Sequence, residues 1–204
     1  MNAGVSACIT RRIHGTKVDN IYRVLLTRVK GDLSWYSVAK YADVSYGWAH
    51  RILKGLEEEG IIKGHKVKKP RRLFEKWAER PDTRKYREYH IQEPLGVFKG
   101  FKFDFALTGH FAENLINGYL FPRYYDIYIQ QTDALSGHRN LVKNGYVGKG
   151  NVRILLTDDH VFFERRTVNG WPMISIQQLI VDLIREGAEC VEAADILIQR
   201  FYHD

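Results

Sequence analysis

The sequence predicts an α+β protein whose front half is helical and basic and whose back half is a mixed α/β domain. The first 90 residues hold 20 Lys and Arg against 10 Asp and Glu, whereas the remaining 114 hold 11 against 14. Apolar residues recur at helical spacing in the front half, and several segments of the back half alternate as strands do. A basic excess confined to one half is typical of polyanion-binding proteins, and nucleic acid is the commonest such polyanion.

The front half is expected to hold four helices and one short charged hairpin. The apolar spacing predicts these helices over residues 18–30, 35–42, 46–59 and 71–78. Ser34 and Ser45 precede the second and third helices as N-caps, while Gly31 and Gly60 end the first and third. A strand over residues 61–62 leads into the hairpin, which spans 63–70 and is rich in lysine.

This order of elements is that of a winged helix-turn-helix. The stretch "VSYGWAHRILKGLEEEGIIKG" resembles the recognition helix and wing entry of many bacterial and archaeal transcription regulators. One face of the third helix is apolar and should pack on its neighbours, so the opposite face is free to enter the major groove. The wing lysines would neutralise phosphates. The residues expected to contact DNA are Ser45, Tyr46, His50, Arg51, Lys54, Lys66, Lys68, Lys69, Arg71 and Arg72. A winged helix that contacts protein, with its lysines merely solvated, stays open as an alternative.

The back half is expected to begin after a linker. Residues 79–90 are charged and contain Pro81, which indicates a linker or an exposed strand. Strands are expected over 97–107, 124–130, 152–156 and 161–166, the last two forming a hairpin. Helices are expected over 109–117, 176–185 and 190–202, the first two capped by Thr108 and Ser175. The resulting division is a basic tail (1–17), a winged-helix domain (18–80), a linker (81–95) and an α/β domain (96–204).

One stretch of the back half is similar to the opening of the nucleotidyltransferase fold. It reads "FALTGHFAENLINGYLFPRYYDIYI", in the order strand, turn, helix and strand. A two-metal site needs a pair of carboxylates on that second strand. Asp126 instead has Tyr128 where the second acid should be, and Asp158 and Asp159 lie in a turn. No catalytic residue, metal or cofactor is therefore expected, and a nucleotidyltransferase-like enzyme is the alternative.

The two halves together resemble the AbiEi-like antitoxins of type IV toxin–antitoxin (abortive infection) systems. The resemblance rests on "RRLFEKWAE", "ALTGHFAENL", "DIYI" and "MISIQQLIVDLIREGAECVEAADILIQRF", and it covers roughly Asn20 to Phe201. It implies a DNA-binding winged helix that represses its own operon and a C-terminal domain tied to antitoxin action. It also implies a nucleotidyltransferase toxin as partner and offers no catalytic residue to transfer.

The function expected from the sequence is that of a cytoplasmic DNA-binding transcription regulator. Double-stranded DNA is the expected partner, and the sequence leaves open a cognate toxin protein and a homodimer. No membrane partner is expected, because no apolar run approaches the roughly 20 residues of a membrane helix. Cys8 and Cys190 are expected to be reduced thiols. A protein-interaction adaptor built on the same folds is a further alternative.

Overall fold

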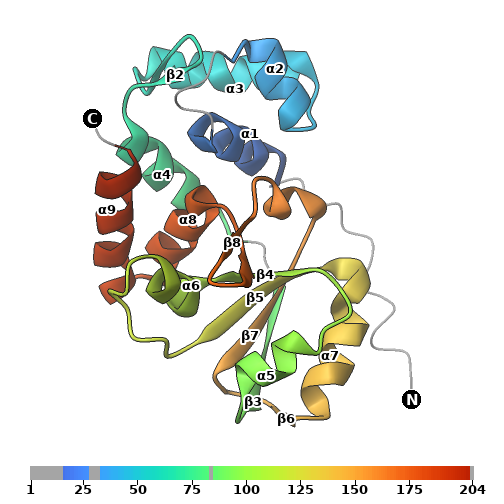
Figure 1. The fold of residues 1–204 in the computed structure, drawn as a ribbon. Coiled ribbons are helices and arrows are strands. Elements are labelled where there is room, and N and C mark those ends of the chain that lie inside the picture. Colours follow the sequence, from blue (N-terminus) through green and yellow to red (C-terminus); the bar gives the residue numbers. More distant parts are fainter. Residues whose placement is uncertain (1–15, 28–32, 83–84, 203–204) are drawn as a thin grey trace.

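A computed structural model describes residues 16–27, 33–82 and 85–202. It confirms a mixed α/β protein with helices at the N-terminus and a mixed sheet behind them (Figure 1). The expected basic tail, 1–17, lies outside the described residues apart from Thr16 and Lys17, which begin the first helix. Gly31, expected to end that helix, also lies outside them. None of the helices in the described ranges combines the length and apolarity needed to cross a bilayer.

The front part contains the four expected helices and a two-stranded hairpin. These elements are α1 (Thr16–Thr27), α2 (Trp35–Tyr41), α3 (Tyr46–Glu58), β1 (Ile62–Lys63), β2 (Lys66–Val67) and α4 (Pro70–Ala78). Ser34 caps α2 as predicted, since its hydroxyl accepts a hydrogen bond from the Ser37 amide at 3.1 Å. Ser45 occupies the N-cap position of α3, but its side chain makes no capping hydrogen bond. Gly60 ends α3 with a φ of 65°, a conformation that favours glycine.

The back part is built on a seven-stranded sheet with the order β6-β3-β7-β5-β4-β9-β8. Its strands are β3 (Lys85–Ile91), β4 (Phe105–Thr108), β5 (Tyr125–Gln130), β6 (Gly145–Val147), β7 (Val152–Thr157), β8 (Arg166–Val168) and β9 (Trp171–Met173). The central strands β5 and β7 run parallel, and β3 is antiparallel to β7. The helices of this part are α5 (Pro94–Lys99), α6 (Gly109–Ile116), α7 (Ala134–Val142), α8 (Ile176–Glu186) and α9 (Glu189–Phe201).

Helices α7 and α8 lie on opposite faces of this sheet. Tyr128 of β5 donates its hydroxyl to Asp182 of α8 at 3.1 Å. The next residue, Ile129, lies against Gly137 of α7. Because successive strand residues point to opposite faces, these two contacts place one helix on each face. Ser175 caps α8 as predicted, accepting from the amide of Gln178.

The segment over residues 81–95, expected to be a linker, contains strand β3, so of the two alternatives left open for the charged stretch the strand is the one formed there. β3 pairs with β7 on one side and with β6 on the other. Tyr89 and Ile91 are each only 1% exposed. The charged residues between these buried positions hid the alternation, and Pro81 lies just before the strand rather than within it.

The strand expected over 97–107 is mostly wrong. Pro94 starts helix α5, since a proline suits the first helical position, and only Phe105–Thr108 is strand. The alternating phenylalanines instead pack against one another: the Phe101 ring lies 5.4 Å from Phe98 and 4.6 Å from Phe103. The alternation of these phenylalanines therefore reflects a local cluster of rings and not the two-residue period of a strand.

The hairpin expected over 152–156 and 161–166 is also wrong. β7 lies inside the sheet between β3 and β5, so it has no free side for a hairpin partner. Asp159–Phe162 forms a 3₁₀ turn, and β8 pairs with β9 instead. Helix α7 and strand β6 were not foreseen, because their segment is short and rich in glycine and asparagine.

The front helices α1 and α4 pack on α8 and α9 of the back part (Figure 1). At the centre of this contact Arg23 of α1 is 3% exposed. Its guanidinium donates to Gln178 of α8 at 2.7 Å and lies 5.3 Å from the ring centre of Trp77 in α4. It also lies 2.7 Å from Nδ1 of His160, in the 3₁₀ turn. Nε2 of His160 then reaches the carbonyl of Tyr41, the last residue of α2, at 2.9 Å.

These two contacts require a neutral His160. Nδ1 accepts from Arg23, so Nε2 carries the proton that it donates to Tyr41. Burial lowers the pKa of His160 and the nearby Arg23 lowers it further, and together they outweigh the hydrogen bond to the Tyr41 carbonyl and the charge of Asp158, which raise it. The folded protein thus favours the uncharged imidazole.

We expect stability to fall as the pH drops below about 6.5, the value of a histidine in the unfolded chain. The lowered pKa in the folded state means that His160 contributes its full stability above that pH and loses it as the pH falls towards the folded value. His160→Gln keeps both hydrogen-bonding roles without titrating. Urea unfolding at neutral and mildly acidic pH should therefore show a smaller loss of stability in His160→Gln. An identical loss in both proteins would contradict the neutral bridge.

Candidate functional site

The outer face of α3 is the most exposed helical surface of the front part. Ala49, Leu53 and Leu56 bury the inner face of this helix. The predicted contact residues of its outer face are all exposed: Ser45, Tyr46, His50, Arg51 and Lys54. Because α1 and α4 face the back part, α3 and the hairpin are left at the far end of the molecule (Figure 1).

Aromatic side chains gather at the start of α3. The ring of His50 lies 5.0 Å from Trp35 and 5.9 Å from Tyr46. Tyr36 is 67% exposed and lies 6.3 Å from Tyr46. Sequence reasoning missed Trp35 and Tyr36 as site residues. The signal was the adjacent Trp-Tyr pair just after the N-cap of α2, since two neighbouring aromatics on a helix cannot both face the core.

The hairpin extends this surface with cations. Lys66, Lys68 and Lys69 are exposed, while Val67 between them is buried and anchors the strand. Trp35 Nε1 donates to the carbonyl of Gly64 at 2.8 Å and so ties the start of α2 to the hairpin turn. The structure therefore brings the predicted helix and hairpin residues onto one connected surface.

Acidic residues lie at the opposite end of α3, and each has a partner. Glu57 accepts from the amide of Gly64 at 2.7 Å. Glu58 lies 3.9 Å from Lys54, and Glu59 lies 2.6 Å from Lys76 of α4. The first turn of α3 contains no acid, so the positive end of the helix dipole meets solvent unopposed.

Arg71 and Arg72 of α4 differ from the other predicted contact residues, because both already face carboxylates. Arg71 lies 2.8 Å from Asp195 of α9, and Arg72 lies 3.2 Å from Glu75 and 3.1 Å from Glu79. Both are exposed, but their charge is already compensated within the protein. The structure thus separates these two arginines electrostatically from the α3 and hairpin residues.

A second candidate site surrounds Asp126, the only acid of strand β5 in the nucleotidyltransferase-like stretch. Asp126 is 3% exposed, and Arg153 of the neighbouring strand β7 donates to both of its carboxylate oxygens at 2.6 Å. Arg153 also donates to Glu186 of α8 at 3.0 Å. A Cβ atom at Gly109 would collide with the carboxylate of Asp126, so this β4–α6 turn requires glycine, which has a φ of 63° here.

The guanidinium of Arg153 stands where a metal-binding Asp126 would need its cation. Burial lowers the pKa of Arg153, but the carboxylates of Asp126 and Glu186 outweigh it and raise the pKa overall. Tyr128, at the position of the missing acid, faces Asp182 instead. The expectation that this part lacks catalytic activity stays a prediction.

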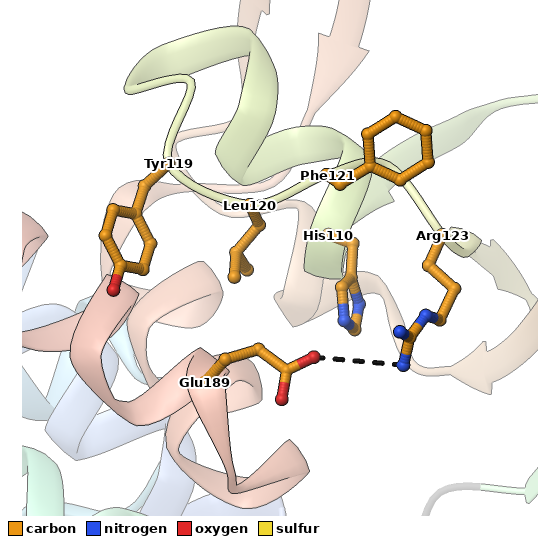
Figure 2. A pocket seen from close by; sticks show the side chains of 6 residues that line it. All are labelled: His110, Tyr119, Leu120, Phe121, Arg123 and Glu189. Carbon is orange, nitrogen blue, oxygen red and sulfur yellow. Dashed lines mark ion pairs between the residues drawn. The ribbon is translucent and has the colours of Figure 1, made fainter.

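A pocket of about 400 Å³ opens beside this cluster, at the start of α6. Figure 2 shows the imidazole of His110 pointing into the space between Arg123 and Glu189, which lie 3.9 Å apart. Nε2 of His110 lies 3.5 Å from the sulfur of Cys190. Burial raises the pKa of that thiol to about 12, so it stays protonated and unreactive at neutral pH.

The α3 and hairpin surface is the stronger candidate for function. It combines exposed cations, exposed aromatics and an unopposed helix N-terminus, whereas the cations at Asp126 and at the pocket are matched by carboxylates. Comparisons of the chain with protein-family models, with curated proteins and with solved structures found no match.

We expect Arg153→Gln to destabilise the fold by about 3–5 kcal/mol, because it leaves a buried carboxylate without its countercharge. The double variant Asp126→Asn, Arg153→Gln should lose less stability than the sum of the two single variants. Urea unfolding measures all three. As a matched control, Arg165→Gln removes an exposed ion pair with Asp104 and should change stability by at most about 0.5 kcal/mol. Additive losses in the double variant would mean that the two charges do not interact.

Proposed function

We propose that the protein is a DNA-binding transcription regulator whose front part is a winged helix-turn-helix. The observation that carries the proposal is the exposed outer face of α3, placed beside a lysine-rich hairpin and away from the back part. A single helix fits the major groove, and a charged hairpin beside it can follow the phosphate backbone. The alternative is an adaptor that binds protein through this surface. It would be favoured if the protein did not bind DNA.

In this proposal α3 is the helix that reads sequence. The free hydroxyl of Ser45 and the unopposed N-terminus suit a backbone phosphate. Arg51 can bind a guanine edge through two hydrogen bonds. The exposed rings of Tyr36 and Tyr46 add apolar surface beside them, suited to a thymine methyl group.

The hairpin lysines supply charge rather than sequence reading. Among the described residues, no carboxylate lies within ion-pair distance of Lys66, Lys68 or Lys69, so these cations are free to replace counterions on DNA. Arg71 and Arg72 must first break their contacts with Asp195, Glu75 and Glu79. We therefore propose that they contribute less to binding than the lysines do.

We further propose that this regulator is the antitoxin of a toxin–antitoxin pair, as its resemblance to AbiEi-like proteins implies. The support is the motif order noted above together with the helical front part joined to a mixed sheet. The partner would then be a nucleotidyltransferase toxin encoded next to this gene. Co-expression with the product of such a neighbour tests it: restored growth supports the pairing, and unrelieved toxicity contradicts it.

The wing is tested by a matched pair of double variants. The slope of log affinity against log salt is negative, and the double variant Lys66→Ala, Lys68→Ala should make it less steep by about 1.8. This corresponds to about 0.9 for each phosphate that is no longer neutralised. The double variant Arg71→Ala, Arg72→Ala removes the same number of charges, and it should reduce the steepness of the slope by less. Fluorescence anisotropy with a labelled duplex at several salt concentrations measures both. Equal slopes for the wild type and the lysine variant would remove the hairpin from the interface.

Sequence reading is tested at Arg51. A two-bond contact with guanine discriminates by roughly 1–3 kcal/mol, so Arg51→Ala should narrow the affinity gap between a selected site and random DNA by that amount. Lys68→Ala is the matched control and should weaken both duplexes equally. If Arg51→Ala retained the full gap on a site selected from random duplexes, α3 would not be the reading helix.

A further inference from the structure

Strand β6 is the outermost strand at one end of the sheet, and no strand of the described ranges pairs with its other side. It pairs with β3 through Tyr89↔Val147, His90↔Tyr146 and Ile91↔Gly145. The amide of Gly148 donates to Glu88 of β3 at 3.1 Å, which makes that pair a hydrogen-bonded one. Because antiparallel pairs alternate, Tyr146 is also bonded to β3, and the backbone groups of Gly145 and Val147 point outwards.

No described strand continues the sheet beyond this edge. An unpaired edge offers a row of N–H and C=O groups to an incoming strand. The β6 segment is held tightly against β3, since a Cβ at Gly145 would collide with the carbonyl of His90 and a Cβ at Gly150 with that of Tyr89. The open backbone is therefore presented in a fixed position.

Helix α7 adds exposed apolar side chains along the same edge, and together with Val147 of β6 they form an apolar strip, called the ledge below. Leu135 and Val142 are 53% and 43% exposed and lie on one helix face, two turns apart. His138, next to them around the helix, contacts the hydroxyl of Tyr89 in β3 at 2.9 Å, so this face of α7 is turned towards the β3–β6 edge. Val147 of β6 is itself 54% exposed. A strand added to β6 would lay alternate side chains on these three residues.

The segment from the start of α7 to the end of β7 carries only positive charge. Between Asp133 and Asp158 the sequence contains no acid, and Arg139, Lys143 and Lys149 are exposed there. Glu88 lies in β3, the strand that pairs with β6, and Glu93 lies just before α5. A second copy pairing at this edge would bring the same cations together, which is unfavourable.

We propose that the open edge of β6 binds an acidic, extended segment of another protein, which adds to the sheet as a further strand. Main-chain hydrogen bonds to Gly145 and Val147 supply affinity, and the ledge and the cations select apolar and acidic side chains. This inference does not depend on DNA binding by α3.

The test selects displayed random peptides of about seven residues, the length of an ordinary strand, on the full-length wild type. The enriched peptides should alternate β-branched and other residues and carry a net negative charge. Val147→Pro removes an outward N–H without breaking the hydrogen bonds between β6 and β3. It should therefore lower the affinity for a selected synthetic peptide by at least about tenfold. Val147→Thr keeps that N–H, so it should bind the peptide more tightly than Val147→Pro does. Lys143→Glu, Lys149→Glu leaves the edge backbone intact and should weaken binding by reversing the charge.

Three results would overturn the proposal. One is that selection enriches no peptide or enriches peptides without an acidic excess. Another is that Val147→Pro, folded by circular dichroism, binds the selected peptide as tightly as Val147→Thr does. The third is a wild-type dimer in sedimentation analysis that Val147→Pro converts to monomer, because the occupant would then be a second copy.

Discussion

The relation between the α3 surface and the sheet depends on one buried cation, the guanidinium of Arg23. Its partners come from three other elements: Gln178 of α8, His160 of the 3₁₀ turn and the ring of Trp77 in α4. A buried guanidinium without partners would cost several kcal/mol. These contacts link α1 to α4, α8 and the 3₁₀ turn, so the front and back parts meet through the polar groups around Arg23.

The packing of α1 and α4 against the back part determines which surfaces of the front part stay exposed to a ligand. Both helices pack against α8, so the outer face of α3 and the hairpin are left exposed. The hydrogen bond from His160 to the Tyr41 carbonyl links the sheet to the end of α2, and Trp35 links the start of α2 to the hairpin. A partner at the sheet would have to shift these contacts to alter the α3 surface, since coupling between sites needs an element with two arrangements.

Several local signals in the sequence predicted local structure correctly, although Ser45 and Thr108 make no capping hydrogen bond. Ser34 and Ser175 cap their helices, Gly60 ends α3, and the front helices lie where apolar spacing indicates. The sequence-based predictions failed where contacts between distant parts of the chain determine the structure. β3 is a strand because β7 and β6 flank it, and nothing within residues 85–91 announces those neighbours. The pairing of Asp126 with Arg153 joins residues 27 positions apart and could not be read from either one.

The two halves also treat charge differently, and this difference bears on where a polyanion can bind. Arg23 is buried among polar partners, Arg153 is half-buried against Asp126 and Glu186, and Arg71 and Arg72 face carboxylates. Net charge alone would count all of them as available to DNA. A cation attracts a phosphate effectively only when it does not have to give up a carboxylate first, because the protein partner offsets the gain. Among the described residues beside α3, Arg51 and the hairpin lysines meet this condition, so in the proposed complex they would carry most of the attraction to DNA.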